Sequence, residues 1–315
     1  MNKFKDNALY NFKSKKKLYN FLYIDNLEKA INNYNVYITK PNRLVEQPIG
    51  ELERIHRRIF KFLKKVPLPD YLFSSKKGVS YIDNAKQHQG NQYVVALDLS
   101  KFFPNCNASY INKLFVDKFN MSKDVAYIMT NICTIDTSKV KLNRNVVNWY
   151  EKVNGQLKYS IPERHIPTGS SLSQLLAFLS FKGMFDEMYE YAIEHKLTFS
   201  VFVDDVVISS KKPIKSSTVD DLKRIASSYG HQINKLKVKR YGKIYNKKIT
   251  GVIIRADGTL KSPSSKHQKC MQKINEFKNE PTLRNKQIVL GNLQSIKMIE
   301  PNKFKIIINE IKKAN

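Results

Sequence analysis

Two stretches frame the chain: Gln92–Asn105 (QYVVALDLSKFFPN) and Phe199–Ser210 (FSVFVDDVVISS). Both are rich in β-branched and aromatic residues, which predicts strands, and two aspartates interrupt the second, which predicts a hairpin. Asp98 ends the first strand, and Asp204 and Asp205 lie at the bend of the hairpin. If these strands are neighbours, three carboxylates converge, and such a cluster is costly unless cations neutralise it. We therefore expect a magnesium site, since Mg²⁺ prefers oxygen ligands.

An exposed acidic turn is the alternative for the Asp-Asp pair, because aspartate is common in turns. Two observations favour the metal site. Apolar runs flank the pair on both sides, and the chain has only 27 Asp and Glu against 55 Lys and Arg.

The rest of the chain alternates between helical and extended patterns. Apolar residues recur every three or four positions in 51–65, which predicts an amphipathic helix. Further helices are predicted over 109–119, 123–133, 170–195, 219–229 and beyond 263, short helices over 1–40, a strand over 248–254, a basic extended segment over 233–245 and an irregular one over 141–166. The order of elements from 92 to 254 predicts an α+β fold, with a sheet covered on one face by helices.

The chain of 315 residues is 42% hydrophobic and carries a net charge of +28. The hydrophobic content excludes a disordered chain. The charge favours a polyanionic partner: nucleic acid first, an anionic membrane surface second, with a Lys-rich coding bias as the plain alternative. No apolar stretch is long enough to span a membrane or to serve as a signal peptide, and three cysteines without metal-like spacing suit a reducing compartment. We expect a cytoplasmic protein without a membrane partner.

At these residues the chain resembles reverse transcriptases. The stretch 92–105 resembles their first palm motif, an Asp followed five residues later by an aromatic residue, and FVDDVVIS resembles their aromatic-x-Asp-Asp motif. Ile166–Ser173 (IPTGSSLS) resembles the Leu-Pro-Gln-Gly-x-x-x-Ser motif. Gly230–Lys237 (GHQINKLK) resembles the segment that carries the family's lysine.

Three further segments resemble the retron branch of this family. Asn84–His88 (NAKQH) matches its Asn-Ala-x-x-His element, and Ile249–Gly251 (ITG) matches its Val-Thr-Gly element. Arg43–Pro48 (RLVEQP) matches the fingers segment Arg-x-Ile-x-x-Pro. The matches occur in the family's order, from about residue 40 to the C-terminus.

The resemblance implies an α+β right-hand polymerase, with fingers, a palm built on an antiparallel sheet and a helical thumb. The expected divisions are 1–92 for N-terminal helices and fingers, 93–255 for the palm with a fingers-associated insertion at about 105–165, and 256–315 for the thumb. It also implies that no fused nuclease, maturase or effector domain follows the thumb.

The resemblance also implies roles for particular residues. The metal ligands are Asp98, Leu99, Asp204 and Asp205, and the nucleotide-binding residues are Arg43, Phe102, Phe103, Gly169 and Lys237. In these roles Arg43 grips the triphosphate, Phe103 excludes a ribose 2′-hydroxyl, and Gly169 lets the backbone approach the template–nucleotide pair. Of the two adjacent rings, one is expected to face inward and one toward the site. Lys237 assists pyrophosphate departure.

The chain departs from the family pattern at four positions. Thr168 replaces the usual Gln, and Phe202 and Val203 replace the residues usual before Asp-Asp. Lys101 stands where an acid is frequent. These changes bear on nucleotide contacts and on the floor beneath the primer end.

Contacts to RNA or DNA are expected from basic and polar residues outside the carboxylate cluster. They are Arg54, Arg57, Arg58, Asn84, His88, Lys235, Lys239, Lys266 and Lys269. Plain alternatives remain for each group: His88 as a satisfied core histidine, 51–65 as a solvated basic face, 235–248 as a charged sheet edge, and Thr250-Gly251 as a structural turn.

The sequence thus predicts an RNA-directed DNA polymerase that uses two Mg²⁺ ions about 3.5–4 Å apart and deoxynucleoside triphosphates. The retron resemblance implies a structured non-coding RNA as template and primer, a short DNA product and a separate effector protein in antiphage defence. The alternatives are a bacterial defence reverse transcriptase that makes linear DNA, and an RNA-binding scaffold with an inactive palm.

Overall fold

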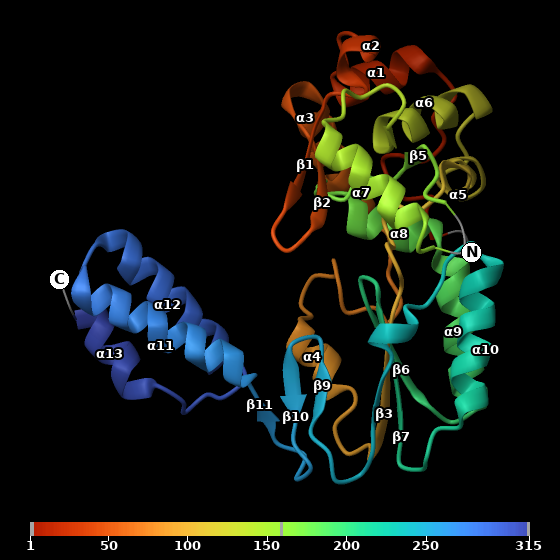
Figure 1. The fold of residues 1–315 in the computed structure, drawn as a ribbon. Helices are drawn as coiled ribbons and strands as arrows, with labels where there is room; N and C mark the ends of the chain where they lie inside the picture. The colour runs from red at the N-terminus through yellow and green to blue at the C-terminus, as the bar shows by residue number, and fades with distance from the viewer. Residues whose placement is uncertain (1–2, 158–159, 314–315) are drawn as a thin grey trace.

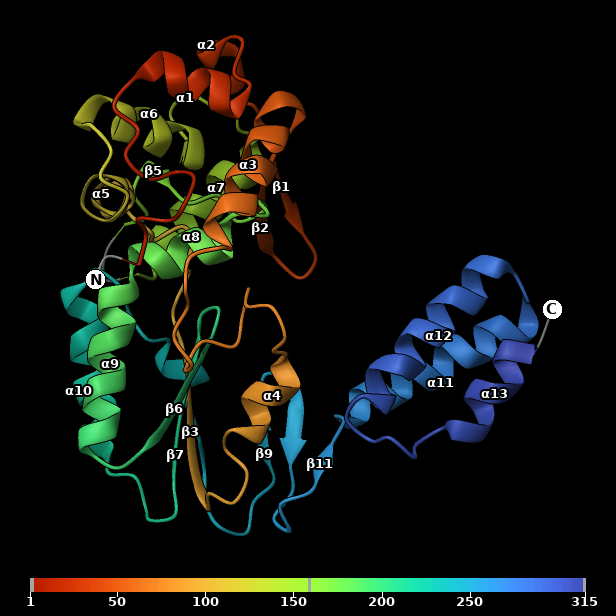
Figure 2. The same cartoon turned by 180° about the vertical axis from the view of Figure 1, so that it is seen from behind.

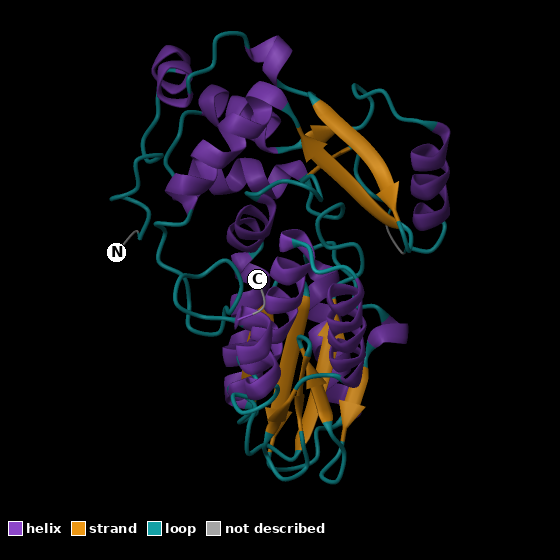
Figure 3. Ribbon diagram, turned by 90° about the vertical axis from the view of Figure 1, so that its left-hand side faces the viewer, coloured by secondary structure: helices purple, strands orange, loops and turns teal. Residues whose placement is uncertain are grey.

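The computed structural model describes residues 3–157 and 160–313. Three parts are visible in Figure 1: a mostly helical upper part, a central sheet below it, and a helical C-terminal bundle set to one side. Figure 3 shows the strands of the central sheet gathered in the lower part, while in the upper part helices surround a long hairpin. The expected α+β fold of a right-hand polymerase is confirmed.

The central sheet has four antiparallel strands in the order β6 (Thr198–Phe202), β7 (Asp205–Ser210), β3 (Tyr93–Asp98) and β8 (Lys239–Tyr241). The hairpin expected around the Asp-Asp pair is therefore confirmed as β6 and β7. Its turn requires a left-handed residue, and Val203 has φ of 60°. The strand expected near 92–99 lies between the two partners β7 and β8.

Strand alternation gives this sheet two covered faces. One face presents Val95 and Ile208 to the helices α9 (Lys182–Glu194) and α10 (Ser216–Ser228). The other presents Val94 and Val207 to a separate apolar cluster. That cluster is built from α4 (Tyr81–Lys86), β9 (Lys247–Ile249) and β10 (Val252–Ile254). Seen from behind, the two layers lie on opposite sides of the sheet (Figure 2). The expectation of a single covered face was incomplete.

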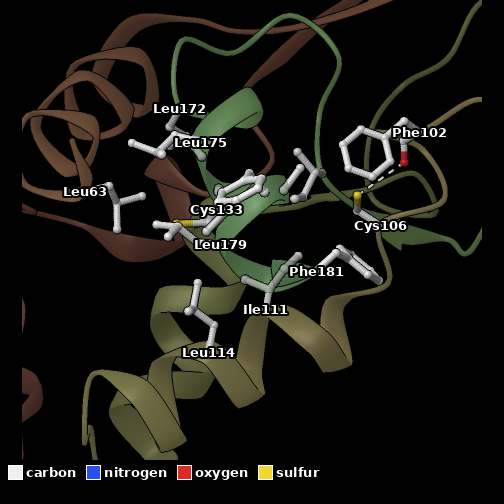
Figure 4. Packing of buried hydrophobic residues seen from close by; sticks show 14 of the residues in the cluster. Leu63, Phe102, Cys106, Ile111, Leu114, Cys133, Leu172, Leu175, Leu179 and Phe181 are labelled. Carbon is white, nitrogen blue, oxygen red and sulfur yellow. Dashed lines mark hydrogen bonds between the residues drawn. The ribbon is translucent and has the colours of Figure 1, made fainter. Parts of the chain in front are cut away.

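The upper part brings segments from both sides of β3 together. Its elements are α1 (Lys15–Leu22), α2 (Leu27–Ala30), β1 (Tyr34–Thr39), β2 (Arg43–Pro48), α3 (Gly50–Leu63), α5 (Ala108–Lys113), the π-helical η1 (Leu114–Lys118), α6 (Lys123–Cys133), β4 (Ile135–Asp136), α7 (Arg144–Asn154), β5 (Arg164–His165) and α8 (Ser173–Ser180). One hydrophobic core joins these elements to the α9–α10 face of the sheet. Figure 4 shows part of it, where Leu63, Cys133 and Leu179 meet.

Two segments of the upper part differ from the sequence-based expectation. Residues 34–39 form a strand rather than a short helix. The segment 141–166 was expected to be irregular, but it contains α7, whose buried Val146, Trp149 and Val153 lie three and four residues apart. These residues lie on one face of the helix, and the polar residues described on both sides of α7 form no regular element that extends it.

Two apolar runs expected to be continuous are broken. The helix predicted over 170–195 divides at Phe181, whose φ of −108° and ψ of 20° leave helical geometry. Its ring is buried against Tyr110 and His231, a tertiary contact that apolar periodicity does not reveal. The strand predicted over 248–254 is two antiparallel strands, β9 and β10, joined by a turn at Thr250 and Gly251, both with positive φ.

The C-terminal bundle has its own small core. It contains α11 (Ser264–Asn279), α12 (Leu283–Lys297) and α13 (Lys305–Lys313), and it follows the short strand β11 (Leu260–Lys261). Cys270, Ile274, Val289 and Leu293 are buried within it. Among the described residues, no helix combines the length and the apolarity that crossing a membrane requires.

Candidate active site

The three aspartates of the two opening motifs meet at one end of the central sheet. Strand register pairs Asp98 of β3 directly with Asp205 of β7. The backbone nitrogen of Leu99 donates to the carbonyl oxygen of Asp204 over 3.0 Å, which ties the end of β3 to the hairpin turn. The hydroxyl of Ser74 accepts a hydrogen bond from the nitrogen of Val203 over 3.0 Å. Residues more than a hundred positions apart are thus brought to a single edge.

The carboxylates raise one another's pKa. Burial, followed by the negative charges of Asp204 and Asp98, raises the pKa of Asp205 to about 7. Burial and then Asp98 raise the pKa of Asp204. Raised pKa values show that too little positive charge lies near these carboxylates to stabilise their ionised forms. The cluster therefore favours the binding of a cation.

Lys237 supplies part of that charge. It ends the short 3-10 turn η2 (Lys235–Lys237), and its Nζ lies 3.0 Å from both carboxylate oxygens of Asp98. Asn234 fixes this turn, because its nitrogen donates to the carbonyl oxygen of Asp98 over 2.8 Å. The expected role of Lys237 at pyrophosphate is not tested by this contact, which pairs it with a carboxylate.

Within the described residues, no group of three or more His, Cys, Asp or Glu side chains is arranged as a finished metal cage. The donor chemistry nevertheless fits Mg²⁺. Asp98, Asp204 and Asp205 offer only oxygen atoms, repel one another and face an open pocket. Asp98 is held by Lys237, so binding an ion would require this ion pair to loosen.

A pocket of about 460 Å³ opens in front of the carboxylates. It is bounded by the sheet edge, by the start of β2, by the turn after β3 and by α7. Its lining includes Arg43, Leu99, Lys101, Phe103, Trp149, Thr168 and Lys237. One end of the pocket is acidic and its sides carry three cations, which suits a ligand with phosphate groups next to a bound cation.

The two adjacent phenylalanines differ in burial. Phe102 is only 3% exposed and packs against Phe185 and His231, whereas Phe103 is partly buried. Figure 4 shows the Phe102 ring within the core and its carbonyl oxygen accepting from Cys106 Sγ at 3.2 Å. Both residues touch the pocket, but the ring of Phe102 serves chiefly as its buried support.

Gly169 makes a close backbone contact that differs from the expected one. A Cβ at this position would lie 2.9 Å from the carbonyl oxygen of Glu46 and 3.1 Å from Cα of Gln47. The nitrogen of Gly169 donates to the same Glu46 oxygen over 3.1 Å. The glycine therefore lets β2 lie against the Ile-Pro-Thr-Gly loop.

Thr168 strengthens the same junction. Its hydroxyl donates to the carbonyl oxygen of Leu44 and accepts from the nitrogen of Glu46, both over 3.0 Å. The Glu46 side chain is fully buried, with His165 Nε2 at 2.9 Å and Tyr150 as a further partner. No local sequence pattern indicates this Glu46 network, because its members lie far apart along the chain.

Asn84 and His88 are corrections. Both are fully buried, so neither can contact RNA as expected. His88 bridges the two strands of the Asp-Asp hairpin, with Nδ1 2.7 Å from Ser209 Oγ and Nε2 2.8 Å from Ser200 Oγ. Asn84 donates to Thr250 Oγ1 over 3.2 Å. The Asn-Ala-x-x-His element therefore braces the sheet and the β9–β10 turn, and the core alternative for His88 holds.

The basic candidates of α3 divide into two groups. Arg54 and Arg57 are exposed, and Arg57 also pairs with Glu53. Arg58 donates to the carbonyl oxygen of Phe21 over 2.5 Å and lies 4.2 Å from the centroid of the Tyr23 ring, so it anchors the N-terminal segment. Its contacts are structural.

The remaining lysines lie outside the carboxylate cluster. Lys235, Lys239 and Lys269 are exposed. Lys266 is half-buried and lies 5.0 Å from the centroid of the Tyr81 ring, which links the start of α11 to α4. Lys239 lines a second hollow on the Thr250-Gly251 side of Asp98 and Asp205.

Comparison with known proteins agrees with this geometry. The family model "Reverse transcriptase (RNA-dependent DNA polymerase)" matches residues 29–254. The Retron Se72 reverse transcriptase of Salmonella heidelberg is 25% identical over 178 residues, which cover 56% of this chain and 40% of the relative. The Retron Ec83 and Ec86 reverse transcriptases of Escherichia coli are 23% and 24% identical, covering 69% and 68% of this chain and 66% and 59% of their own lengths.

Two telomerases are among the similar solved structures. Telomerase from Candida albicans in complex with a fragment of telomeric RNA is 15% identical, with a TM-score of 0.46 over 97% of this chain and 59% of that one. Apo telomerase from Candida tropicalis is 13% identical, with a TM-score of 0.45 over 76% of this chain and 50% of that one. On the match to more than two thirds of its length, with the aspartates of both palm motifs at one sheet edge, the chain belongs to the reverse transcriptase family.

Proposed function

We propose that this chain is an RNA-directed DNA polymerase of the retron type, which copies a dedicated structured RNA into a short single-stranded DNA. The observation that carries the proposal is the meeting of Asp98, Asp204 and Asp205 at the mouth of a pocket lined by cations. Family membership and the retron names of the curated relatives support it. The net charge of +28 favours a nucleic-acid partner.

In this proposal Asp98, Asp204 and Asp205 hold Mg²⁺, with Leu99 beside them. Bound magnesium would activate the primer 3′-hydroxyl and stabilise the leaving pyrophosphate. The protein's own task is to orient the deoxynucleoside triphosphate: Arg43 takes its phosphates, and the partly buried Phe103 excludes a 2′-hydroxyl. Lys237 is released from Asp98 to face the departing pyrophosphate.

The finer parts of the proposal concern partners. A structured non-coding RNA serves as both template and primer, a separate effector protein acts with the product in antiphage defence, and the protein works in the cytoplasm. The exposed Arg54, Arg57, Lys235, Lys239 and Lys269 are the candidates for contact with nucleic-acid phosphates.

Primer extension on an RNA template with Mg²⁺ tests the polymerase. We expect extension by the parent, loss of at least a thousandfold in rate in Asp204→Asn and Asp205→Asn, and parental activity in the exposed control Asp220→Asn. A parent no more active than the two variants would contradict the polymerase function and favour an RNA-binding scaffold.

Sequencing of the nucleic acid that co-purifies with the protein tests the retron type. A DNA joined through a 2′–5′ branch to a structured RNA is the expected result. Linear DNA alone, made by an active parent, would instead indicate a bacterial defence reverse transcriptase of another class.

A further inference from the structure

The chain's single tryptophan lies in the wall of the candidate active site. Trp149 of α7 is 5% exposed, and its Nε1 donates to the carbonyl oxygen of Asn42 over 3.2 Å. Lys101, three residues after Asp98, lies with Nζ 4.7 Å from the centroid of the Trp149 ring. Lys101 has φ of 49°, a left-handed conformation that few non-glycine residues adopt, and it belongs to the turn that leaves β3.

The position of Lys101 is electrostatically unusual. Lys101 lies near both Lys237 and Asp98, but among the described ion pairs it has no carboxylate within salt-bridge distance. Arg43 and Lys237 line the same pocket. Three cations gathered around one hollow repel one another, and Lys237 alone is neutralised by Asp98. The hollow therefore favours a ligand that brings several negative charges.

We propose that Lys101 binds the phosphates of the incoming deoxynucleoside triphosphate, and that its ammonium group contacts the Trp149 ring when no nucleotide is bound. The inference rests on the proposed function and adds a residue that the family motifs do not assign. A lysine ammonium is a mobile point charge on a flexible stem, suited to phosphate. The cation–π contact is worth only about 0.5–2 kcal/mol, so a phosphate can displace it.

A purely structural role is the competing explanation. Lys101 would then hold α7 against the turn after β3 and would never leave Trp149. A third occupant, a phosphate of the template or primer strand, would also attract Lys101. The experiment must separate the three.

The measurement uses the full-length protein with an adenine-containing RNA template, a dideoxy-terminated primer and Mg²⁺, so that dTTP binds without reacting. Because Trp149 is the only tryptophan, its fluorescence reports on this contact. We expect a saturable change on adding dTTP to the parent complex. Equilibrium dialysis with labelled dTTP should give a dissociation constant about tenfold or more weaker in Lys101→Met, near-parental in Lys101→Arg, and unchanged in the exposed control Lys141→Met.

Extension kinetics provide a second readout. With an unterminated primer, Lys101→Met should raise KM for dTTP about tenfold while kcat changes by less than about threefold. Parental dTTP affinity and KM in Lys101→Met, with or without a lower melting temperature, would overturn the proposal and leave a structural role. Weakened binding of the template–primer duplex with unchanged dTTP affinity would overturn it in favour of a strand phosphate.

Failure of this inference is distinguishable from failure of the proposed function. A parent that extends primers and a Lys101→Met variant with parental KM would refute only the role of Lys101. A parent that extends no primer would refute the polymerase. The dialysis measurement would still decide whether Lys101 contributes to dTTP binding.

Discussion

Buried histidines should make this protein sensitive to mild acid, and His88 provides the sharpest test. Burial lowers the pKa of His88 from 6.5 to about 3, because both its ring nitrogens are enclosed between Ser200 and Ser209. Below pH 6.5, His88 therefore binds a proton in the unfolded chain but stays neutral in the folded chain. Stability contributed by the neutral ring is present above pH 6.5 and is lost as the pH falls toward 3.

The size of the effect follows from these values. From pH 6.5 to pH 5 the pH falls by 1.5 units, and each unit corresponds to about 1.36 kcal/mol. The buried neutral His88 therefore lowers the free energy of unfolding at pH 5 by about 2 kcal/mol. Burial also lowers the pKa of His56 to about 4 and that of His231 to about 3. Together the three histidines cost about 6 kcal/mol at pH 5, which is comparable with the whole stability of many domains.

The perturbation is His88→Gln, and the assay is urea unfolding followed by circular dichroism at several pH values between 7.5 and 5. The variant should be less stable than the parent at pH 7.5, because its hydrogen bonds to the two serines are imperfect. Its loss of stability on going to pH 5 should nevertheless be smaller than the parent's by about 2 kcal/mol. The exposed control His195→Gln should follow the parent. Parallel curves of stability against pH for the parent and His88→Gln would show that His88 does not cause the acid sensitivity.

Three residues of the candidate active site and its surroundings give further predictions. Gly169→Ala should lower the free energy of unfolding by about 1–3 kcal/mol in urea titrations, because its Cβ would lie 2.9 Å from the Glu46 carbonyl oxygen. Parental stability would show that β2 can move away to make room for the Cβ. Lys237→Met should bind Mg²⁺ several-fold more tightly in the absence of nucleotide, since the ion no longer competes with Nζ for Asp98, and a metal titration followed by melting temperature measures this. Weaker metal binding would contradict it. Phe103→Val should reduce discrimination against ribonucleotides by about tenfold or more in competitive extension. Unchanged discrimination would contradict the role of Phe103 in excluding the 2′-hydroxyl.

Local sequence patterns identified the main elements and the acidic centre. Runs of β-branched and aromatic residues before Asp98 and around Asp204 and Asp205 predicted the three strands, because strand propensity and turn chemistry are short-range properties. The helix expected over 109–119 contains the π-helical η1, and the helix expected over 170–195 breaks at Phe181, whose ring packs against Tyr110. Apolar periodicity indicates neither feature.

That three carboxylates lie at strand ends, and that the chain is strongly basic, can be read from the order of residues alone. What the other motif residues contact depends on how distant segments pack together. His88 meets Ser209 across 121 positions, Gly169 meets the backbone of Glu46, and Lys101 rests on Trp149. Burial and hydrogen-bond partners arise from contacts between distant segments, whereas a linear motif records only which residue types lie near one another along the chain.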